Sequence, residues 1–590
     1  MKNSKEIAQE SIRVMSDKMF LLLAVLVTLA GTFLRFIWLG LKPFHHDEGV
    51  NGVFLSTLAK TGEWNYDPSN YHGPDLYYIS LFVTNIIGLD DVGTRSSVAI
   101  FGVFIIILAF WLRRSVGDIG AIVAAILLAI SPGMVYISRY FIHEIIFVFF
   151  SFAIPVSILF FIERRKAGVI AQGLFAIVLG VALLPAQVIL VNNILGTAGI
   201  AALTVRILGS IGVAFLIFLL VKRAAAWMDG SPIYLMLGAV SVCMLFATKE
   251  TGFITVGTML LSCVSVVLWE KISGRKRGSE ESLSYKRFVE ALGDGRNRQI
   301  MIASSVGLFV ILWIVFFSSF FTNAKGIVDS FKAYAFWTQT GTVVHQNGFW
   351  AYLKWMWEIE APILLLSALG VIFALAKQRN RFVVFAAFWA MGISLAYTLI
   401  PYKTPWLMIS FILPMTVVAG HAIDEMITNR IESLKLVGAI LIMIAVGIAG
   451  KQSWSLNFDR YDDQSLPYVY AHSWRTLDDL TAKLDELDKR VGGQGNLTIQ
   501  VVASEFWPLP WSLRNFRSVG FPGEPKPFDG KDVILARYKE REEEVVAYYQ
   551  DKYRYLGKYP LRPTLEIMLL VRKDIAGSEG EPLRLELMSR

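Results

Sequence analysis

Cysteine and charge are both scarce in this sequence of 590 residues. The two cysteines, Cys243 and Cys263, lie in apolar runs, which excludes a disulfide scaffold and a cysteine-based metal site. Only 18% of the residues are charged, whereas a typical soluble domain has about 25%. With 55% of the residues hydrophobic, this composition excludes a disordered chain and a wholly soluble protein.

Long apolar segments are what the sequence has in abundance. Runs of the length needed to cross a bilayer, about 17–25 residues, recur from Met19 to about Gly450 and then stop. We expect about thirteen spans, near 19–39, 96–112, 117–137, 145–162, 168–190, 199–221, 232–248, 252–269, 300–321, 361–376, 382–399, 405–422 and 434–450. The predicted fold class is a polytopic all-α membrane protein with a small C-terminal α/β domain.

Basic loops indicate the orientation of these spans. Five of the six loops that follow the even-numbered spans are clearly basic, and the loop 271–299 alone has eight Lys and Arg against four acids. By the positive-inside rule these loops are cytoplasmic, and so is the N-terminal tail, 1–18, which lacks a cleavage-site pattern. An odd number of spans then places the domain 451–590 on the extracytoplasmic side of the cell membrane. The net charge is +8. Because the excess of basic over acidic residues lies largely in short loops, it does not indicate nucleic acid as a partner.

Ionisable residues gather where the transmembrane domain, 19–450, reaches its outer side. They begin in the long first outer loop, 40–94, and recur in the shorter loops at the same face. Charged groups at bilayer depth are costly and usually face a cavity or each other. Carboxylates beside cations suit a site that activates a hydroxyl and holds a phosphate. The residues are Asp47, Glu48, Arg139, Glu144, Lys249, Glu250 and Lys403.

Each of these residues also has a structural interpretation. Asp47 and Glu48 would complement a helix dipole, Arg139 would anchor to lipid headgroups, and Lys249 and Glu250 would form an ordinary ion pair. Histidines on the same side leave a divalent metal ion as an open alternative, although no recognisable ligand spacing supports one. These histidines are His45, His46, His72, His143 and His345.

Motifs around the same residues resemble those of the GT-C superfamily of integral-membrane glycosyltransferases. The likeness is closer to its protein O-mannosyltransferase and aminoarabinose-transferase branch, in which an Asp-Glu pair follows the first span. Thr94–Gly102 resembles the Arg-x-Pro-Ser-x-x-x-Gly motif with serine for proline. Ser138–Glu144 is similar to Ser-Arg-x-x-x-x-Asp with glutamate for aspartate, and Phe246–Gly252 to Lys-Trp-x-Gly with glutamate for tryptophan.

A narrower resemblance covers nearly the whole chain. Five motifs in order are similar to those of prokaryotic GT-C-like proteins described as flippase-activity-associated, a name that does not settle catalysis. The motifs are His45–Gly49, Tyr71–Pro74, Thr248–Thr251, Tyr402–Trp406 and Trp507–Trp511.

The resemblance implies a polyprenyl-phosphate-linked sugar as donor, held by membrane lipid and apolar spans, and a hydroxyl of a protein, glycan or lipid as acceptor. It implies Asp47 as the catalytic base, with Glu48 and Glu144 in support, and Arg139 as a ligand of the donor phosphate. Charge and position extend the phosphate site to Lys249 and Lys403. No cofactor is indicated besides the open alternative of a metal ion. The substrate-binding candidates are His46, Tyr71, His72, Tyr402 and Trp406.

The tail alternates helical and strand-like patterns. Leucines at helical spacing follow Thr476, and 541–555 also reads as a helix, whereas 497–503, 533–536 and 564–572 read as strands. The aromatic loop Trp507–Trp511 would either stack on a sugar or dock the domain onto the membrane part, and docking is favoured. The glycines of 492–495 match no phosphate-binding motif, so a nucleotide-sugar donor is not expected.

Two other functions remain as alternatives to a glycosyltransferase. A non-catalytic GT-C-like protein would bind lipid-linked sugars or assist their flipping with the same fold. A secondary transporter would place its ionisable residues near the bilayer midplane, often within inverted repeats. The clustering at one face and the lack of an evident repeat argue against the transporter.

Overall fold

The computed structural model describes residues 15–69, 72–274, 283–343, 346–527 and 529–587. The chain divides into two compact units, each described here by itself. The first comprises Met1–Ile37, Lys60–Ile87 and Arg95–Asn457. The second comprises Trp38–Ala59, Gly88–Thr94 and Phe458–Arg590, so parts of the first outer loop fold together with the C-terminal domain.

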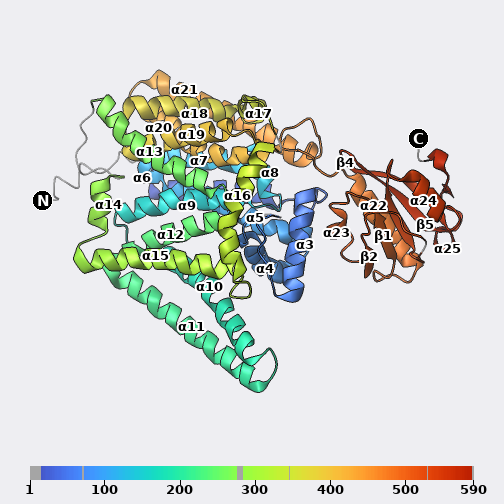
Figure 1. Cartoon of the computed structure of the whole chain (residues 1–590). Helices are drawn as coiled ribbons and strands as arrows, with labels where there is room; N and C mark the ends of the chain where they lie inside the picture. Colours follow the sequence, from blue (N-terminus) through green and yellow to red (C-terminus); the bar gives the residue numbers. More distant parts are fainter. Residues whose placement is uncertain (1–14, 70–71, 275–282, 344–345, 528, 588–590) are drawn as a thin grey trace. The chain divides into compact units, whose positions relative to one another are not determined.

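The first unit is a bundle of apolar helices (Figure 1). Among the described residues, ten helical stretches are long and apolar enough to cross a membrane, or up to twelve if each bent pair is one span. The helices of this bundle are α2 (Asp17–Phe36), α5 (Asp91–Trp111), α7 (Asp118–Ile130), α8 (Pro132–Ser138), α9 (Glu144–Ile162), α10 (Val169–Leu195), α11 (Ile200–Ala226), α12 (Ser231–Thr248), α13 (Gly252–Ile272), α15 (Gly295–Phe317), α18 (Ala361–Lys377), α19 (Arg381–Leu399), α20 (Ile409–Ile427) and α21 (Glu432–Trp454).

Each of the thirteen predicted spans coincides with a helix, and the predicted fold class is confirmed. The lower count arises because α11 and α12 follow each other without a loop and count as one stretch, Ile200–Thr248. It is broken at Trp227–Gly230, where Met228 and Asp229 adopt left-handed backbone conformations. Two further spans are bent: α7 and α8 meet at 58°, and α17 (Ala351–Ile359) and α18 meet at 111°.

The two bent helix pairs meet at a buried carboxylate that the sequence analysis did not single out. Glu360 Oε1 accepts hydrogen bonds of 2.8 Å from Ser131 Oγ and from the Gly133 backbone N–H. Both donors belong to the start of α8, so the carboxylate satisfies the buried N-terminus of that helix at the bend.

The basic loops share one face of the bundle. Hydrogen bonds and ion pairs join loops that are far apart in sequence, so their common location does not depend on the predicted topology. Five contacts show that these loops lie together: Arg113 with Asp17, Asn380 with Ser115, Arg379 with Asp424, Arg381 with Glu270, and Arg164 with Glu290. Because α9, α12 and α13 each have one end at this face, Glu144 and the α12–α13 turn lie at the opposite end of the bundle.

Short helices occupy the first outer loop and several loops between the spans. The first outer loop forms α3 (His46–Thr61) and α4 (Asp75–Ile87). Further short helices are α6 (Arg113–Val116), α14 (Tyr285–Ala291) and α16 (Lys325–Val343). The helices α10 and α11 form a hairpin that extends away from the other helices of the unit (Figure 1).

The C-terminal part of the second unit is an α/β fold around a six-stranded sheet of order β2-β1-β3-β5-β4-β6. The strands are β1 (Thr498–Val502), β2 (Ser518–Gly520), β3 (Val533–Arg537), β4 (Tyr553–Arg562), β5 (Leu565–Arg572) and β6 (Glu581–Pro582). β1 pairs in parallel with β2 and β3, whereas β5, β4 and β6 continue the sheet in antiparallel pairing. The helices are α22 (Thr476–Arg490), α23 (Leu509–Ser512), α24 (Glu542–Tyr549) and α25 (Lys573–Ala576).

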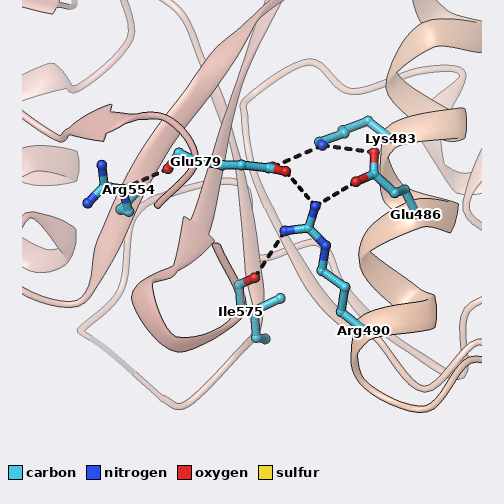
Figure 2. A network of polar contacts seen from close by, with 6 residues as sticks. All are labelled: Lys483, Glu486, Arg490, Arg554, Ile575 and Glu579. Carbon is cyan, nitrogen blue, oxygen red and sulfur yellow. Dashed lines mark hydrogen bonds and ion pairs between the residues drawn. The ribbon is translucent and has the colours of Figure 1, made fainter. Parts of the chain in front are cut away.

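The two faces of the sheet have separate cores because side chains alternate along each strand. The leucine stripe of α22 packs against Ile499 and Val501 on one face. On the other face Val545 and Tyr549 of α24 pack against Val502. Salt bridges at the surface join α22 to the segment after α25. Glu579 accepts from Lys483 (3.0 Å) and Arg490 (2.6 Å) of α22 (Figure 2).

One predicted element of the tail is wrong in its extent. The helix expected at 541–555 ends at Tyr549, and β4 begins at Tyr553. β4 gains a full partner in β5, and tyrosine is well suited to a half-buried strand. A local helical pattern contains no information about that distant pairing.

Candidate functional site

The turn between α12 and α13 carries the best-defined charges of the outer end of the first unit. Lys249 Nζ lies 2.6 Å from Glu144 Oε1 at the start of α9, and both side chains are almost fully buried, with 6% and 7% exposed. Burial disfavours the charge on Lys249, but the carboxylate of Glu144 outweighs it and holds the Lys249 pKa above its ordinary value. The structure thus joins two predicted site residues that are 105 positions apart.

A glycine brings the segment after the first outer helix onto the same turn. The Gly73 N–H donates to Thr248 O at 3.1 Å, and a Cβ on Gly73 would lie 1.8 Å from Ala247 O. Thr248 Oγ1 also lies 2.5 Å from Asp75 Oδ2, at the first residue of α4. Only a residue without a side chain allows this close approach, and the approach fixes the position of His72.

His72 forms a second charge pair beside the first. Its Nδ1 lies 2.8 Å from Glu250 Oε2, and the Glu250 side chain is only 9% exposed. Burial raises the pKa of Glu250, but the neighbouring His72 and a backbone N–H outweigh burial and lower that pKa overall. Contrary to the simple expectation of a Lys249–Glu250 ion pair, each of these neighbours pairs with a distant residue.

His143 contacts both Gly73 and His72. Its Nε2 lies 3.1 Å from Gly73 O, and its ring meets the ring of His72 edge to face at 5.3 Å between centroids. Burial, with a smaller contribution from His72, keeps the pKa of His143 well below its ordinary value. His143 is therefore neutral and donates from Nε2 to the carbonyl.

A cavity of about 200 Å³ opens beside both charge pairs. The lining combines charged and polar groups with aromatic and apolar side chains of α16 and of 397–407. This combination can hold a polar group against an apolar chain. The lining residues are Pro68, Ser69, His72, Lys249, Glu250, Thr251, Ala333, Phe336, Trp337, Tyr397, Ile400, Tyr402 and Leu407.

Two other predicted cations are bound to backbone carbonyls rather than lining this cavity. Arg139 is buried, and its Nη1 donates to Leu34, Arg35 and Ile37 at the C-terminal end of α2. Lys403 is buried as well, and its Nζ donates to Ile400 O at 2.7 Å and Asn347 O at 3.3 Å.

Two of the remaining substrate-binding candidates of the first unit, Tyr402 and Trp406, lie close together in sequence. Tyr402 lines the cavity and forms a β-bridge with Gln346. Trp406 is half-buried and lies in the short helix Pro405–Met408. Tyr71 and His345 lie outside the residues that the structure describes.

The acidic pair of the first outer loop belongs to the second unit. Glu48 is fully buried, and its Oε2 accepts from the His45 N–H at 3.0 Å, while His45 Nδ1 accepts from the Asp47 N–H at 3.0 Å. These reciprocal bonds form a helix-capping arrangement at the start of α3. Burial lowers the pKa of His45 to about 4, and the Asp47 side chain beside it is 29% exposed.

The aromatic loop of the tail docks onto this same helix. A Cβ on Gly49 would lie 2.7 Å from Pro508, and one on Gly52 would lie 2.5 Å from Trp511. The ring of Trp511 is fully buried and stacks on Phe44 at 5.0 Å. These contacts of Trp511 lie within the second unit, so docking onto the membrane part stays a prediction. Trp507 lies near His46, with 6.2 Å between ring centroids.

Metal ligands do not gather among these residues. Across the part of the chain that the structure describes, no group of three or more His, Cys, Asp or Glu side chains could hold a metal ion. The histidines instead serve as caps and hydrogen-bond partners, as at His45 and His143.

Comparisons with known proteins fit this architecture. A family model for dolichyl-phosphate-mannose-protein mannosyltransferases matches residues 71–205, which include His72, Arg139 and Glu144. No curated protein sequence matches the chain significantly. Several solved structures are similar.

ArnT from Cupriavidus metallidurans in the apo state has a TM-score of 0.53 at 12% identity, covering 95% of this chain and 98% of ArnT. The same enzyme bound to undecaprenyl phosphate has a TM-score of 0.54 at 13% identity, with coverage of 96% and 100%. The chain has the GT-C fold. An oligosaccharyltransferase from Archaeoglobus fulgidus in the apo form has a TM-score of 0.48 at 11% identity, covering 92% of this chain and 74% of its own.

Proposed function

We propose that this GT-C-fold protein transfers a sugar from a polyprenyl-phosphate-linked donor to an acceptor hydroxyl at the outer membrane face. The observation that carries this proposal is the buried Glu144–Lys249 pair beside a cavity lined by charged, polar and aromatic side chains. A buried, charged lysine beside an apolar wall suits a lipid-linked phosphate. The lipid of that kind in the related ArnT structure, undecaprenyl phosphate, supports the same class of ligand here.

The cations and the acids have different proposed tasks. Lys249 binds the donor phosphate, which displaces Glu144 from it, and Arg139 and Lys403 hold the chain ends around this phosphate site. His72, Tyr402, Trp406, His46 and Tyr71 contact substrate.

Asp47 takes the proton of the acceptor hydroxyl. Its carboxylate is partly exposed at the start of α3, where Glu48 fixes the helix N-terminus. A base must be reachable by substrate, and the partly exposed Asp47 meets this requirement better than the fully buried Glu48. Glu144 supports the reaction through Lys249.

The proposed orientation follows from the shared face of the basic loops. Since such loops stay on the cytoplasmic side, the N-terminus is cytoplasmic and the α12–α13 turn is at the outer face. The helix α21 starts at the basic face, where Glu432 follows the loop after α20, so the C-terminal domain is extracytoplasmic. Reaction of impermeant reagents with single cysteines placed in 271–299 and in 541–544 tests this orientation.

A transfer assay tests the function. Purified protein in lipid nanodiscs receives a panel of polyprenyl-phosphate sugars with mixed acceptors, and Asp47→Asn is compared with the exposed outer-loop control Glu63→Gln. We expect transfer by the wild type and the control, and a loss of about 10²–10⁴-fold in kcat for Asp47→Asn with donor binding retained. Donor binding without transfer by the wild type would instead support a non-catalytic protein that binds lipid-linked sugars or assists their flipping.

A further inference from the structure

A separate cavity of about 510 Å³ lies within the C-terminal domain. It opens where β3 ends and where β4 passes into β5. The roles proposed above use none of its lining residues. We call it the tail cavity, and its lining includes Trp474, Arg537, Tyr538, Lys539, Glu540 and Arg562.

Ion pairs and hydrogen bonds hold the polar side chains of the tail cavity in place. Arg537 Nη1 lies 3.6 Å from Glu540 Oε2 and donates to Ser504 Oγ at 3.0 Å. The Arg562 side chain is only 9% exposed and pairs with Glu505. Side chains that are fixed in advance lose less conformational entropy when a ligand binds.

The chemistry of the lining suits a ligand with several hydroxyl groups. Guanidinium groups only donate hydrogen bonds and carboxylates only accept them, whereas a hydroxyl does both. A sugar can therefore bond to Arg537 and Glu540 together, while a phosphate, which is an anion, is repelled by Glu540. The half-buried rings of Trp474 and Tyr538 add apolar surface with a polar tip. The less polar face of a sugar ring packs on such a surface.

The polar network of the tail cavity has an excess of one positive charge. Each carboxylate has a cation within ion-pair distance, and Glu566 pairs with Lys558 at 3.3 Å. The excess comes from Lys539, which is exposed and lies 5.2 Å from the centre of the Tyr538 ring. The described cations of the network are Arg537, Lys539, Lys558 and Arg562, and the described carboxylates are Glu505, Glu540 and Glu566.

We propose that the tail cavity binds an acidic saccharide that forms part of the acceptor. The sugar ring packs against the aromatic side chains, and its carboxylate lies beside Lys539. The saccharide ligand follows from the cavity itself, whereas its role as acceptor rests on the proposed transferase function.

Contacts inside the second unit connect the tail cavity with the proposed base. Arg562 Nε donates to Trp507 O at 3.2 Å. The ring of Trp507 lies 6.2 Å from the ring of His46, the residue before Asp47. A saccharide that extends from the cavity past Trp507 therefore reaches the segment that carries Asp47, as an acceptor must.

Saccharide binding can be measured without turnover. Full-length protein in nanodiscs is titrated by calorimetry with a tetramer of galacturonate and with its methyl ester, which has the same rings but no charge. We expect the wild type to bind the acid about 2–5-fold more tightly than the ester, with a smaller difference at high salt. Lys539→Gln should remove this preference. Lys489→Gln, an exposed control in α22, should keep it.

The aromatic contact has its own variants. Trp474→Leu should weaken the binding of both tetramers by about 3–10-fold, whereas Trp474→Phe keeps a ring and should retain most of it. Tyr548→Leu, at an exposed position of α24, is the control. Thermal unfolding of each variant separates loss of the contact from loss of the fold. In the transfer assay, Trp474→Leu should raise the KM of an acidic saccharide acceptor with kcat close to wild type.

The outcomes separate the ligand from the proposed function. Equal binding of acid and ester by the wild type, or unchanged binding in Trp474→Leu, overturns the acidic saccharide, and so does tighter binding of tetraglutamate than of the galacturonate tetramer. Wild-type transfer with an unchanged acceptor KM in Trp474→Leu overturns the role as acceptor site alone. Saccharide binding without transfer from any donor contradicts the proposed function and supports the assignment of the ligand.

Discussion

Replacing Gly73 by alanine tests how the candidate site is assembled. The new Cβ would lie 1.8 Å from Ala247 O, where an ordinary contact needs at least 3.4 Å. The obstructing atom is a backbone oxygen at the end of α12, so it cannot swing aside as a side chain would. The segment that carries His72 must therefore move by more than about 1 Å.

The expected cost has two parts. The buried bond from the Gly73 N–H to Thr248 O is weakened, which costs about 1–3 kcal/mol of folding free energy. The displacement also opens the 2.8 Å contact between His72 and Glu250, and a misplacement of about 1 Å can lower catalysis about 100-fold. Sugar transfer and thermal unfolding in nanodiscs measure the two effects separately.

A second glycine supplies the matched control. Gly257 lies in α13, the helix that follows the same turn, and a Cβ there meets nothing within 4 Å. Gly257→Ala should leave kcat unchanged and the protein as stable or slightly more stable. Wild-type kcat in Gly73→Ala would refute the reasoning that the close approach positions His72.

Three further predictions concern stability. Burial raises the Asp75 pKa from 3.8 to about 7. Between these values the folded state binds a proton that the unfolded state lacks, so wild-type stability should fall by up to about 4 kcal/mol as pH rises from about 4 to 7. Asp75→Asn should abolish this dependence in thermal unfolding measured across pH. Lys249→Met leaves Glu144 buried without a countercharge and should cost about 3–5 kcal/mol, most of which a second change, Glu144→Gln, restores; equal instability of the double variant would contradict the pairing. Glu579→Gln removes two half-exposed ion pairs and should cost at most about 1 kcal/mol in chemical denaturation, less at high salt.

Much of the fold could be predicted from local sequence patterns. Apolar length predicted a helix at each of the thirteen spans, and the leucine stripe after Thr476 predicted α22, because burial of one continuous stripe or run is a property of the segment itself. The tail helix expected to reach Tyr555 failed for the complementary reason. Residues 553–562 become a strand through their pairing with β5, which no local pattern contains.

The candidate site was predicted residue by residue but not pair by pair. Lys249 and Glu250 look like partners in the sequence, yet adjacent side chains do not face each other on a helical turn. Their actual partners, Glu144 and His72, are more than a hundred positions away. The Tyr-His-Gly-Pro motif was the available signal, because a glycine between a histidine and a proline marks a close backbone approach.

Arg139 shows the limit of reasoning from charge and position. The sequence places an arginine at the outer end of the bundle, where both a phosphate ligand and a lipid anchor are reasonable. In the structure its guanidinium binds three carbonyls at the end of α2. That use depends on where α2 ends relative to α8, which follows from packing between helices rather than from either segment.

The proposed function requires that this protein transfers a sugar from a polyprenyl phosphate to the hydroxyl of an acceptor molecule. The most direct measurement counts, in one reaction of purified wild-type protein, the polyprenyl phosphate released and the sugar transferred. We expect equal amounts of the two products, with the formation of both reduced together in Asp47→Asn. Bound donor that stays intact, with neither product formed from any donor of the panel, would contradict it.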